Sequence, residues 1–357
     1  MTIDYFSNLA LITATVIYAL ALTMHSIEWA AARRVTTTRR AAGKRADDKA
    51  IATEAGPSLD TAATTSRAAV ASASTLTITR TAAPTPPNSP TRELEDDTDD
   101  DPPGDRMPQH RIEMFGRLGI SFTLIGLACA IAGVAARGIA AHRWPLGNMF
   151  EFTTMAMVII VAGYLVLAKM GMGWLGLPIT MIATVGNGLA VTVFYVAVAG
   201  LVPSLNSYWF IIHITAATIS GAAFNIGGAV SIVYMIKKRA ENKGIENGYL
   251  LRLPESRRID VIAYRMFAFA FPLWTFTIAA GAVWAEYAWG RYWGWDPKEV
   301  WALVTWVIFA CYLHARSTAG WKGTRAAIIG LLGLAVFWFN FIGVNLLLAG
   351  LHSYAGI

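Results

Sequence analysis

The sequence predicts an all-α polytopic membrane protein with about eight transmembrane helices. Hydrophobic residues make up 55% of the 357 residues and charged residues only 15%, whereas soluble domains carry about 25% charged residues. The apolar residues are gathered in runs, and a helix needs about 20 of them to cross a bilayer. Most charged residues lie between these runs. This composition excludes a typical soluble enzyme.

Eight apolar runs are long enough to span the membrane, and each would satisfy its own backbone hydrogen bonds as lipid requires. The first run begins MTIDYF, which contains an acidic residue and no basic one. It is also longer than the apolar region of a signal peptide, so we interpret it as a retained helix rather than a cleaved signal. The predicted spans cover residues 5–32, 114–136, 149–169, 179–200, 208–236, 263–288, 298–316 and 325–348.

Lysine and arginine residues gather in the segments that follow the first, fifth and seventh spans, and the alternate loops carry few of them. Loops rich in these residues face the cytoplasm. The sequence therefore predicts a protein of the plasma membrane with both termini outside.

Residues 33–112 separate the first helix, residues 1–32, from a seven-helix membrane domain over residues 113–357. This segment is rich in Ala, Thr, Pro and charge, and it contains the acidic run ELEDDTDDDPPGD at 93–105. Such a composition buries too little apolar surface to offset the entropy of ordering. We predict a disordered cytoplasmic linker. We interpret it as a solvated spacer, and a protein-binding segment is the alternative.

The loop between the sixth and seventh spans is WGRYWGWDPKE, residues 289–299, and Trp301 follows it. Three tryptophans within seven residues exceed the aromatic belt of an ordinary membrane surface. They can offer flat aromatic surface to a flat apolar ligand, and a loop that only anchors helices is the alternative. Asp296, Pro297 and Glu299 also have the spacing of a capped helix start, which we favour for the two acids.

Two histidines lie at the predicted depth of this loop. His213 is near the outer end of the fifth span, and His352 follows the eighth span. Ionisable residues inside spans are costly and often functional. Two neutral imidazoles beside an aromatic platform suit the two axial positions of a haem iron. Interfacial polar residues are the alternative interpretation.

A third histidine, His314, lies near the inner end of the seventh span and cannot reach the outer loop. It could bind a second haem near the cytoplasmic face, or it could cap the helix C-terminus. His25 has a similar depth beside Glu28, so a His25–His314 pair is a further alternative. The chain has no CxxC motif, which excludes a thiol-redox pair of its own.

The segment WGRYWGWDPKEVWALVTW at 289–306 resembles the tryptophan-rich WWD signature of haem-handling proteins, whose loop covers residues 289–301 here. Within that superfamily the chain resembles the CcsA/ResC family of System II cytochrome c biogenesis, called CcsB in some actinobacteria. The resemblance covers most of residues 115–357, and the segment 33–112 has no recognised counterpart. Further matching segments are PLGNMFEF (145–152), LVPSLNSYWFIIH (201–213), CYLHAR (311–316) and GVNLLLAGLHSY (343–354).

The resemblance implies that His213 and His352 bind an external haem. It implies that His314 binds a haem within the membrane, with a fourth histidine from a partner of the ResB/Ccs type. Asn148 and Glu151 match a further motif of the family, and we expect them near the external haem, with a role in packing or topology as the alternative. The remaining residues expected at the haem are those of the loop, namely Trp289, Trp293, Trp295 and Asp296, with Arg291 near it. A basic residue beside the tryptophans, Arg291 or Lys298, could contact haem propionates.

The function implied by the resemblance is delivery of haem b, as a substrate, to apocytochrome c and its covalent attachment to a Cys-x-x-Cys-His motif on the outer face. Holocytochrome c synthase activity is expected only together with the ResB-type partner. A thiol-reducing protein is expected as a second partner, and nucleic acid is not. The alternatives are a haem or small-molecule transporter without attachment chemistry, a b-type electron carrier and a membrane scaffold.

Overall fold

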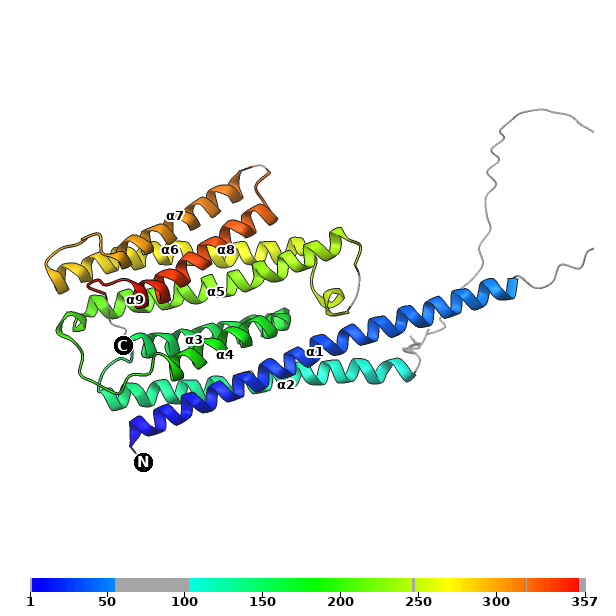
Figure 1. The fold of residues 1–357 in the computed structure, drawn as a ribbon, viewed down its shortest axis with the longest axis horizontal. Coiled ribbons are helices and arrows are strands. Elements are labelled where there is room, and N and C mark those ends of the chain that lie inside the picture. The colour runs from blue at the N-terminus through cyan, green and yellow to red at the C-terminus, as the bar shows by residue number, and fades with distance from the viewer. Residues whose placement is uncertain (1, 55–102, 246–247, 319, 353–357) are drawn as a thin grey trace, which may run out of the picture. The chain divides into compact units, whose positions relative to one another are not determined.

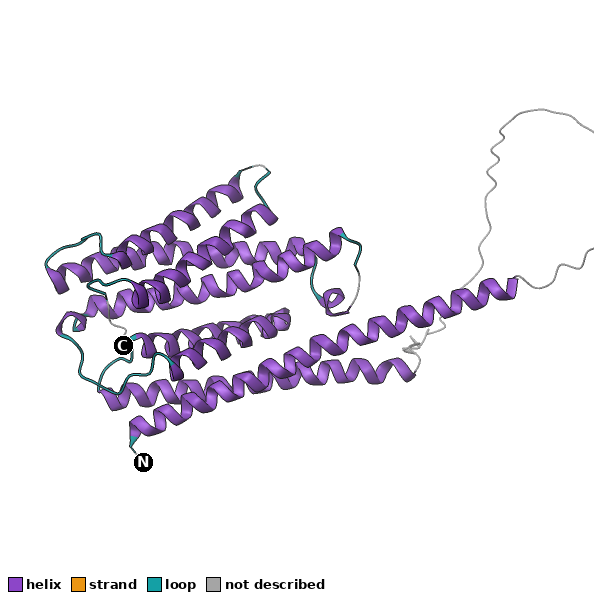
Figure 2. Ribbon diagram, viewed as in Figure 1, coloured by secondary structure: helices purple, strands orange, loops and turns teal. Residues whose placement is uncertain are grey.

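The computed structural model describes residues 2–54, 103–245, 248–318 and 320–352, and every regular element among them is a helix (Figure 2). The chain divides into two units, one of residues 1–37 with 107–357 and one of residues 38–106. The first unit is a helical bundle. Seven stretches of the described residues are long and apolar enough to cross a membrane. The predicted class, an all-α polytopic membrane protein, is confirmed.

The helices on both sides of the predicted linker are longer than the sequence suggested. Helix α1 spans Ile3–Glu54 and α2 spans Pro103–Ala141, so both ends of the segment 33–112 are helical. Residues 41–54 are rich in alanine and long charged side chains, which favour a helix even without an apolar face. Pro103 suits the first position of a helix because an amide hydrogen at that position would have no acceptor within the helix. The remainder of the predicted linker, residues 55–102, lies outside the described residues.

The membrane-spanning part of α1 packs closely against α2. Leu11 and Tyr18 are fully buried. A Cβ atom added at Gly133 of α2 would lie only 2.7 Å from the Leu11 side chain, and one added at Gly126 would lie 2.7 Å from Tyr18. The Ser7 hydroxyl also donates to the Gly133 carbonyl at 2.7 Å. Small residues let membrane helices approach in this way. The first helix is therefore an integral member of the bundle.

One apolar stretch, Met149–Thr192, contains the third predicted span and residues 179–192 of the fourth, whose predicted end at 200 lies beyond the end of the helix. Helix α3 (Met149–Leu167) leads through η1 (Ala168–Met172) and η2 (Gly173–Leu175) into α4 (Gly176–Thr192). Gly171 has a φ of 87° within this turn, a conformation that glycine adopts readily. The two helices lie side by side (Figure 1). The hairpin explains why eight predicted spans correspond to seven apolar stretches.

Helix α5 (Tyr208–Asn242) lies at the centre of the bundle, between α3 and the helices α6 (Ser256–Trp289) and α8 (Thr324–Trp338) (Figure 1). Most of its apolar stretch is buried, and its small residues permit this closeness. Its Phe224 stacks on Phe309 with ring centroids 3.9 Å apart. The remaining elements are η3 (Pro203–Leu205), η4 (Gly248–Arg252), α7 (Pro297–Ser317), α8 (Thr324–Trp338), η5 (Phe339–Gly343) and α9 (Val344–Leu347).

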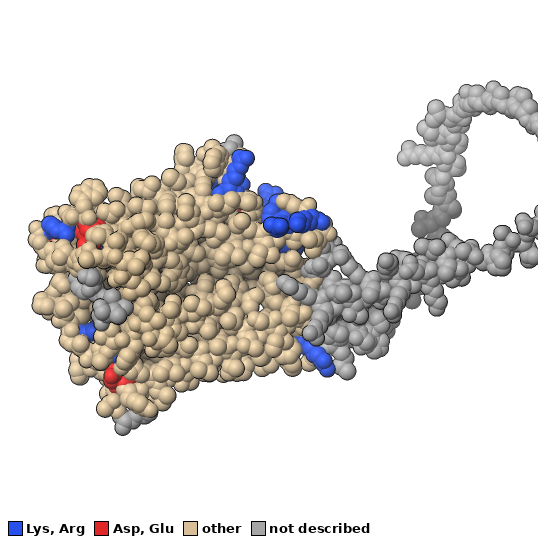
Figure 3. Space-filling view, in the orientation of Figure 1, with Lys and Arg blue, Asp and Glu red and all other residues tan. Residues whose placement is uncertain are grey.

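Exposed basic side chains gather at the end of the bundle where α5 and α7 finish and α6 and α8 begin (Figure 3). The opposite end, where α1 begins, carries charges of both signs. The basic end is the one that the sequence predicts to face the cytoplasm. Its exposed residues include Arg239, Lys243, Arg252, Arg257, Arg258, Lys322 and Arg325.

A buried ionic cluster joins α1, α2 and α3 at the opposite end. The Arg137 side chain is 1% exposed, and it donates to Glu151 at 3.1 Å, to Asp4 at 3.0 Å and to the Val196 carbonyl at 2.6 Å. Arg143 donates to the other Glu151 oxygen at 2.7 Å. A buried charge is tolerated only when it is paired in this way. The cluster therefore fixes the position of α1 relative to α2 and α3.

Replacing Arg137 with methionine should leave Glu151 and Asp4 without their shared partner. We expect the free energy of unfolding to fall by ~3–5 kcal/mol, which is typical for breaking one side of a buried ion pair. The measurement is reversible unfolding of the full chain in detergent micelles. Arg117→Met, which removes an exposed arginine from the same helix, is the matched control and should change stability little. Equal effects of the two variants would contradict the structural role of the cluster.

Candidate functional site

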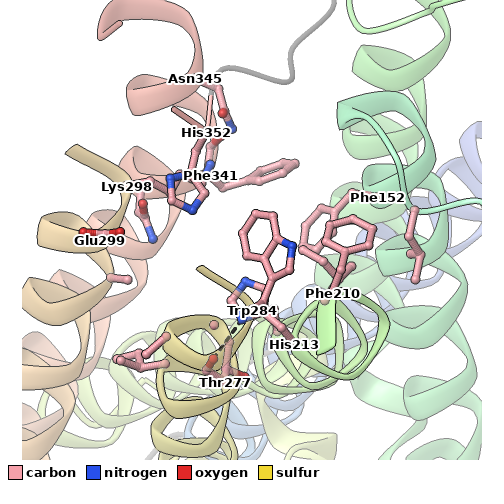
Figure 4. Close-up of a pocket in the computed structure, with 18 of the residues that line it drawn as sticks. Phe152, Phe210, His213, Thr277, Trp284, Lys298, Glu299, Phe341, Asn345 and His352 are labelled. Carbon is pink, nitrogen blue, oxygen red and sulfur yellow. Dashed lines mark hydrogen bonds between the residues drawn. The ribbon is translucent and has the colours of Figure 1, made fainter. Parts of the chain in front are cut away.

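A cavity of about 170 Å³ lies at the end of the bundle opposite the basic end (Figure 4). The residues that line it come from helices α3 and α5–α9, from η3 and η5, from the segments 146–148 and 292–293, and from His352 after α9. Its wall is mainly aromatic and aliphatic, with a few polar groups, which is the usual character of a small-molecule site. The polar lining residues are Asn148, His213, Thr277, Lys298, Glu299, Asn340, Asn345 and His352.

His213 reaches the cavity from α5 and is held by α6. Its Nδ1 lies 2.8 Å from the Thr277 carbonyl oxygen, so Nδ1 donates and Nε2 carries the lone pair. A Cβ atom at position 281, one turn further along α6, would come within 2.7 Å of the ring. Glycine at 281 therefore makes room for the imidazole to reach the carbonyl. A histidine oriented by a carbonyl in this way is typical of metal ligands.

His352 lies on the opposite side of the cavity, and Asp296 orients it. The His352 Nδ1 donates to Asp296 Oδ1 at 2.9 Å, while the Leu351 amide donates to Oδ2 at 2.7 Å. Burial raises the pKa of Asp296, but the hydrogen bonds from His352, Leu351 and the Lys298 amide outweigh it and hold the pKa at about 2. The carboxylate is therefore charged at neutral pH, and it fixes the His352 tautomer with the lone pair on Nε2.

Trp284 of α6 lies between the two histidines (Figure 4). Its ring centroid is 5.7 Å from that of His213, nearly parallel to it, and 5.5 Å from that of His352. The indole Nε1 donates to the Ser204 carbonyl at 2.8 Å. Trp284 is 2% exposed. Sequence reasoning missed this residue because it lies inside an apolar run, and only its spacing of five residues from Trp289 could have drawn attention to it.

The three predicted loop tryptophans take different positions. Trp289 contacts His352, with ring centroids 4.8 Å apart, and Trp293 lines the cavity. Trp295 does not line the cavity. It is 70% exposed with a φ of 59°, and it contacts Trp293 edge-on at 5.8 Å. An exposed tryptophan at the end of a membrane bundle is typical of an interfacial anchor.

The predicted capping of α7 is confirmed. Asp296 accepts from the Lys298 amide at 3.1 Å, and Glu299 accepts from the Asp296 amide at 3.1 Å, which together complete a capping box. Glu299 also accepts from the Gly294 amide at 2.8 Å and from Arg291 at 3.3 Å. These bonds hold the loop in a single shape beside the cavity. Arg291 is thus paired with Glu299 rather than directed into the cavity wall.

His314 lies on the exposed surface of α7 near the basic end, far along the helix from the cavity. His25 is 1% exposed and pairs with Glu28, whose Oε2 lies 3.2 Å from its Nδ1. A Cβ atom at Gly176 would come within 2.4 Å of the His25 ring, so α4 closes over it. The buried His25 and the exposed His314 do not form the pair that a b-type electron carrier would need.

Asn148 and Glu151 lie at the start of α3, and only Asn148 lines the cavity. Asn148 caps the helix by accepting from the Glu151 amide at 2.9 Å. Glu151 is fully buried and belongs to the ionic cluster with Arg137 and Arg143. Its contacts are therefore structural. Asn340 of the π-helical η5 is a lining residue that sequence reasoning missed, because nothing in the sequence marks a π-helical turn.

Comparison with known proteins identifies similar chains over most of the bundle. The family model described as cytochrome C assembly protein matches residues 119–352. The cytochrome c biogenesis protein CcsA of Mesostigma viride is 36% identical over 269 residues, covering 68% of this chain and 87% of that protein. The CcsA protein of Gloeothece citriformis is 33% identical over 285 residues, covering 66% and 87% respectively. Both histidines at the cavity lie within the matched range, whereas α1 lies outside it.

Replacing Asp296 with alanine should release the segment after α9, because Asp296 holds both Leu351 and His352. We expect the Leu351 amide to exchange its hydrogen at least about tenfold faster, as expected for loss of ~1.5 kcal/mol or more of charge-assisted hydrogen bonding. Hydrogen–deuterium exchange followed by mass spectrometry measures it. Glu286→Ala, near the same end of the bundle, is the control. An unchanged exchange rate in Asp296→Ala would show that other contacts hold this segment.

Proposed function

Because this chain belongs to the cytochrome c assembly protein family, we propose that it acts in cytochrome c maturation by holding haem in the cavity for covalent attachment to apocytochrome c. The observation that carries this proposal is the pair His213 and His352. Each is fixed through Nδ1, one by a carbonyl and one by a carboxylate, and both line one aromatic cavity. Histidines oriented in this way are suited to bind iron through Nε2.

In this proposal the haem is the substrate, and the protein supplies position. The aromatic wall excludes water and holds the porphyrin plane. Each cysteine thiol of the apocytochrome adds across one haem vinyl group, forming a carbon–sulfur bond while the thiol proton goes to the terminal vinyl carbon. The addition needs no oxidant. Fixing the vinyl groups beside two thiols supplies much of the rate acceleration, and a thiol-reducing protein keeps the cysteines free.

His314 is proposed to serve a second haem site. It is exposed on α7, where a membrane partner of the ResB type can approach and add a fourth histidine. Haem would reach the cavity from this site, which lies nearer the basic end. From the positive-inside rule we infer that this end faces the cytoplasm and that the cavity lies at the outer side of the plasma membrane. Synthase activity then belongs to the complex with the partner rather than to this chain alone.

Trp284 must move if one iron binds both histidines. Its centroid is almost equally distant from the two imidazoles, so it lies near the plane midway between them. A porphyrin bound by both histidines occupies that same plane. The indole and the haem therefore compete for the space, and the bond from Trp284 to Ser204 breaks when the haem enters.

The test of the two-site proposal is the haem spectrum of wild type, His213→Ala, His352→Ala and His314→Ala, each purified with and without the partner. We expect either cavity substitution to abolish a low-spin, bis-histidine haem, because both axial ligands are needed. His314→Ala should alter a separate haem that is present only with the partner. His142→Ala is a histidine control outside both sites. Absence of haem from the wild type in both preparations would overturn the proposal.

Removing the Trp284 indole should help haem enter the cavity. We expect Trp284→Ala to bind haem faster than wild type and at least as tightly, because the free protein no longer has to expel a side chain first. Stopped-flow absorbance in the Soret band measures the rate. Trp274→Ala removes another tryptophan from the cavity wall and should give no acceleration. Weaker haem binding by Trp284→Ala alone would instead make Trp284 a permanent wall of the haem site.

A further inference from the structure

Lys298 brings a cationic side chain into the wall of the cavity. It lies at the start of α7 and lines the cavity beside His352 (Figure 4). Its Nζ lies 5.9 Å from the centre of the Phe341 ring. Much of the surrounding wall is apolar. A cation in such a place is costly unless an anion or another strong partner stabilises it.

The two acids nearest in sequence are already occupied. Glu299 accepts hydrogen bonds from Arg291 and from two loop amides. Asp296 accepts from His352, from the Leu351 amide and from the Lys298 amide, but not from the Lys298 side chain. Among the residues that the structure describes, none forms an ion pair with Lys298. The positive charge is therefore available to a ligand inside the cavity.

We propose that Lys298 binds a propionate carboxylate of the haem and so determines which edge of the porphyrin faces the α7 side of the cavity. The inference rests on the proposed function. Haem is apolar except at the edge that carries its two propionates, and Phe152 and Phe210 lie across the cavity from Lys298 (Figure 4). The charged edge thus meets the cation, and the apolar remainder meets the aromatic wall. Arg291 does not line the cavity and is paired with Glu299.

This contact matters for the proposed attachment because the porphyrin is not symmetric. Two axial histidines fix the iron but allow the ring to rotate about the iron–nitrogen axis. A charge-assisted bond at one propionate stops that rotation. The vinyl groups then point in one direction, which two thiols of fixed spacing require. Lys298 is in this sense a positioning residue, which acts on the orientation of the haem and not on its iron.

The experiment compares haem with haem dimethyl ester, whose propionates carry no charge. Each is titrated into the full chain in detergent, and the low-spin Soret band is followed. We expect the wild type to bind haem about tenfold more tightly than the diester. Lys298→Met should lose this preference, with affinity for the diester unchanged, which also shows that the cavity is intact. Lys298→Arg should keep most of the preference, and Lys322→Met, a charge removed at the basic end, should keep all of it.

The outcomes separate this inference from the proposed function. A wild type that binds both ligands equally, or a preference that persists in Lys298→Met, overturns the role of Lys298 and leaves haem binding standing. A wild type that binds neither ligand overturns the proposed function itself. If Lys298→Met binds neither ligand, Lys298→Arg decides, because the inference stands only if that variant keeps the preference.

Discussion

The carboxylate of Asp296 connects the tryptophan loop, the start of α7 and the segment after α9, which together form one side of the candidate site. One oxygen begins α7 by accepting from the Lys298 amide, and it also orients His352. The other oxygen holds the backbone of the segment after α9 through Leu351. A single buried anion thus joins the tryptophan loop, the start of α7 and the end of the described chain. Because α7 and the segment after α9 share this group, the position of His352 follows from the shape of the loop.

The opposite wall is built from helices alone. His213 lies on α5, its partner carbonyl lies in the middle of α6, and the glycine at 281 lets the two meet. Close packing of α5 with α6, α7 and α8 around Phe224 keeps this wall rigid. The ionic cluster of Arg137, Glu151 and Asp4 then fixes α1, α2 and α3 to the same end of the bundle. The cavity is therefore set between a rigid helical wall and a loop held by one carboxylate.

Much of this architecture could be predicted from the sequence, because hydropathy and helix capping are local signals. The apolar runs gave the spans, although the tight turn at Gly171 merges two of them into one apolar stretch. Asp296, Pro297 and Glu299 revealed the start of α7 through their spacing. The depth of His213 and His352 along their spans correctly predicted that both lie at one end. Depth alone also showed that His314 could not join them.

Other features depend on how the helices are rotated and packed, which no local signal records. The same apolar run contains Trp274 and Trp284, and only the packing of α6 against α5 and η3 places Trp284 between two histidines. Trp295 looked equivalent to its neighbours, yet the backbone at 295 turns it outward. We expected Glu151 near the ligand. In the folded chain, Arg137 and Arg143 pair with its two carboxylate oxygens instead. The composition of 33–54 suggested disorder because it lacks an apolar face, although the alanine and long charged side chains of 41–54 favour a helix.

The two histidine anchors differ in a way that bears on how a ligand could leave. His213 is held by the main chain of α6, so the carbonyl that orients it moves only if two packed helices move. His352 is held by a side chain, and the described residues of the segment that carries it, 348–352, form no helix after α9 ends at Leu347. Breaking the bonds at Asp296 moves His352 and Leu351 together, because one carboxylate holds both. The bonds at Asp296 are therefore shared by His352 and Leu351, whereas the carbonyl that orients His213 belongs to the packed helical wall.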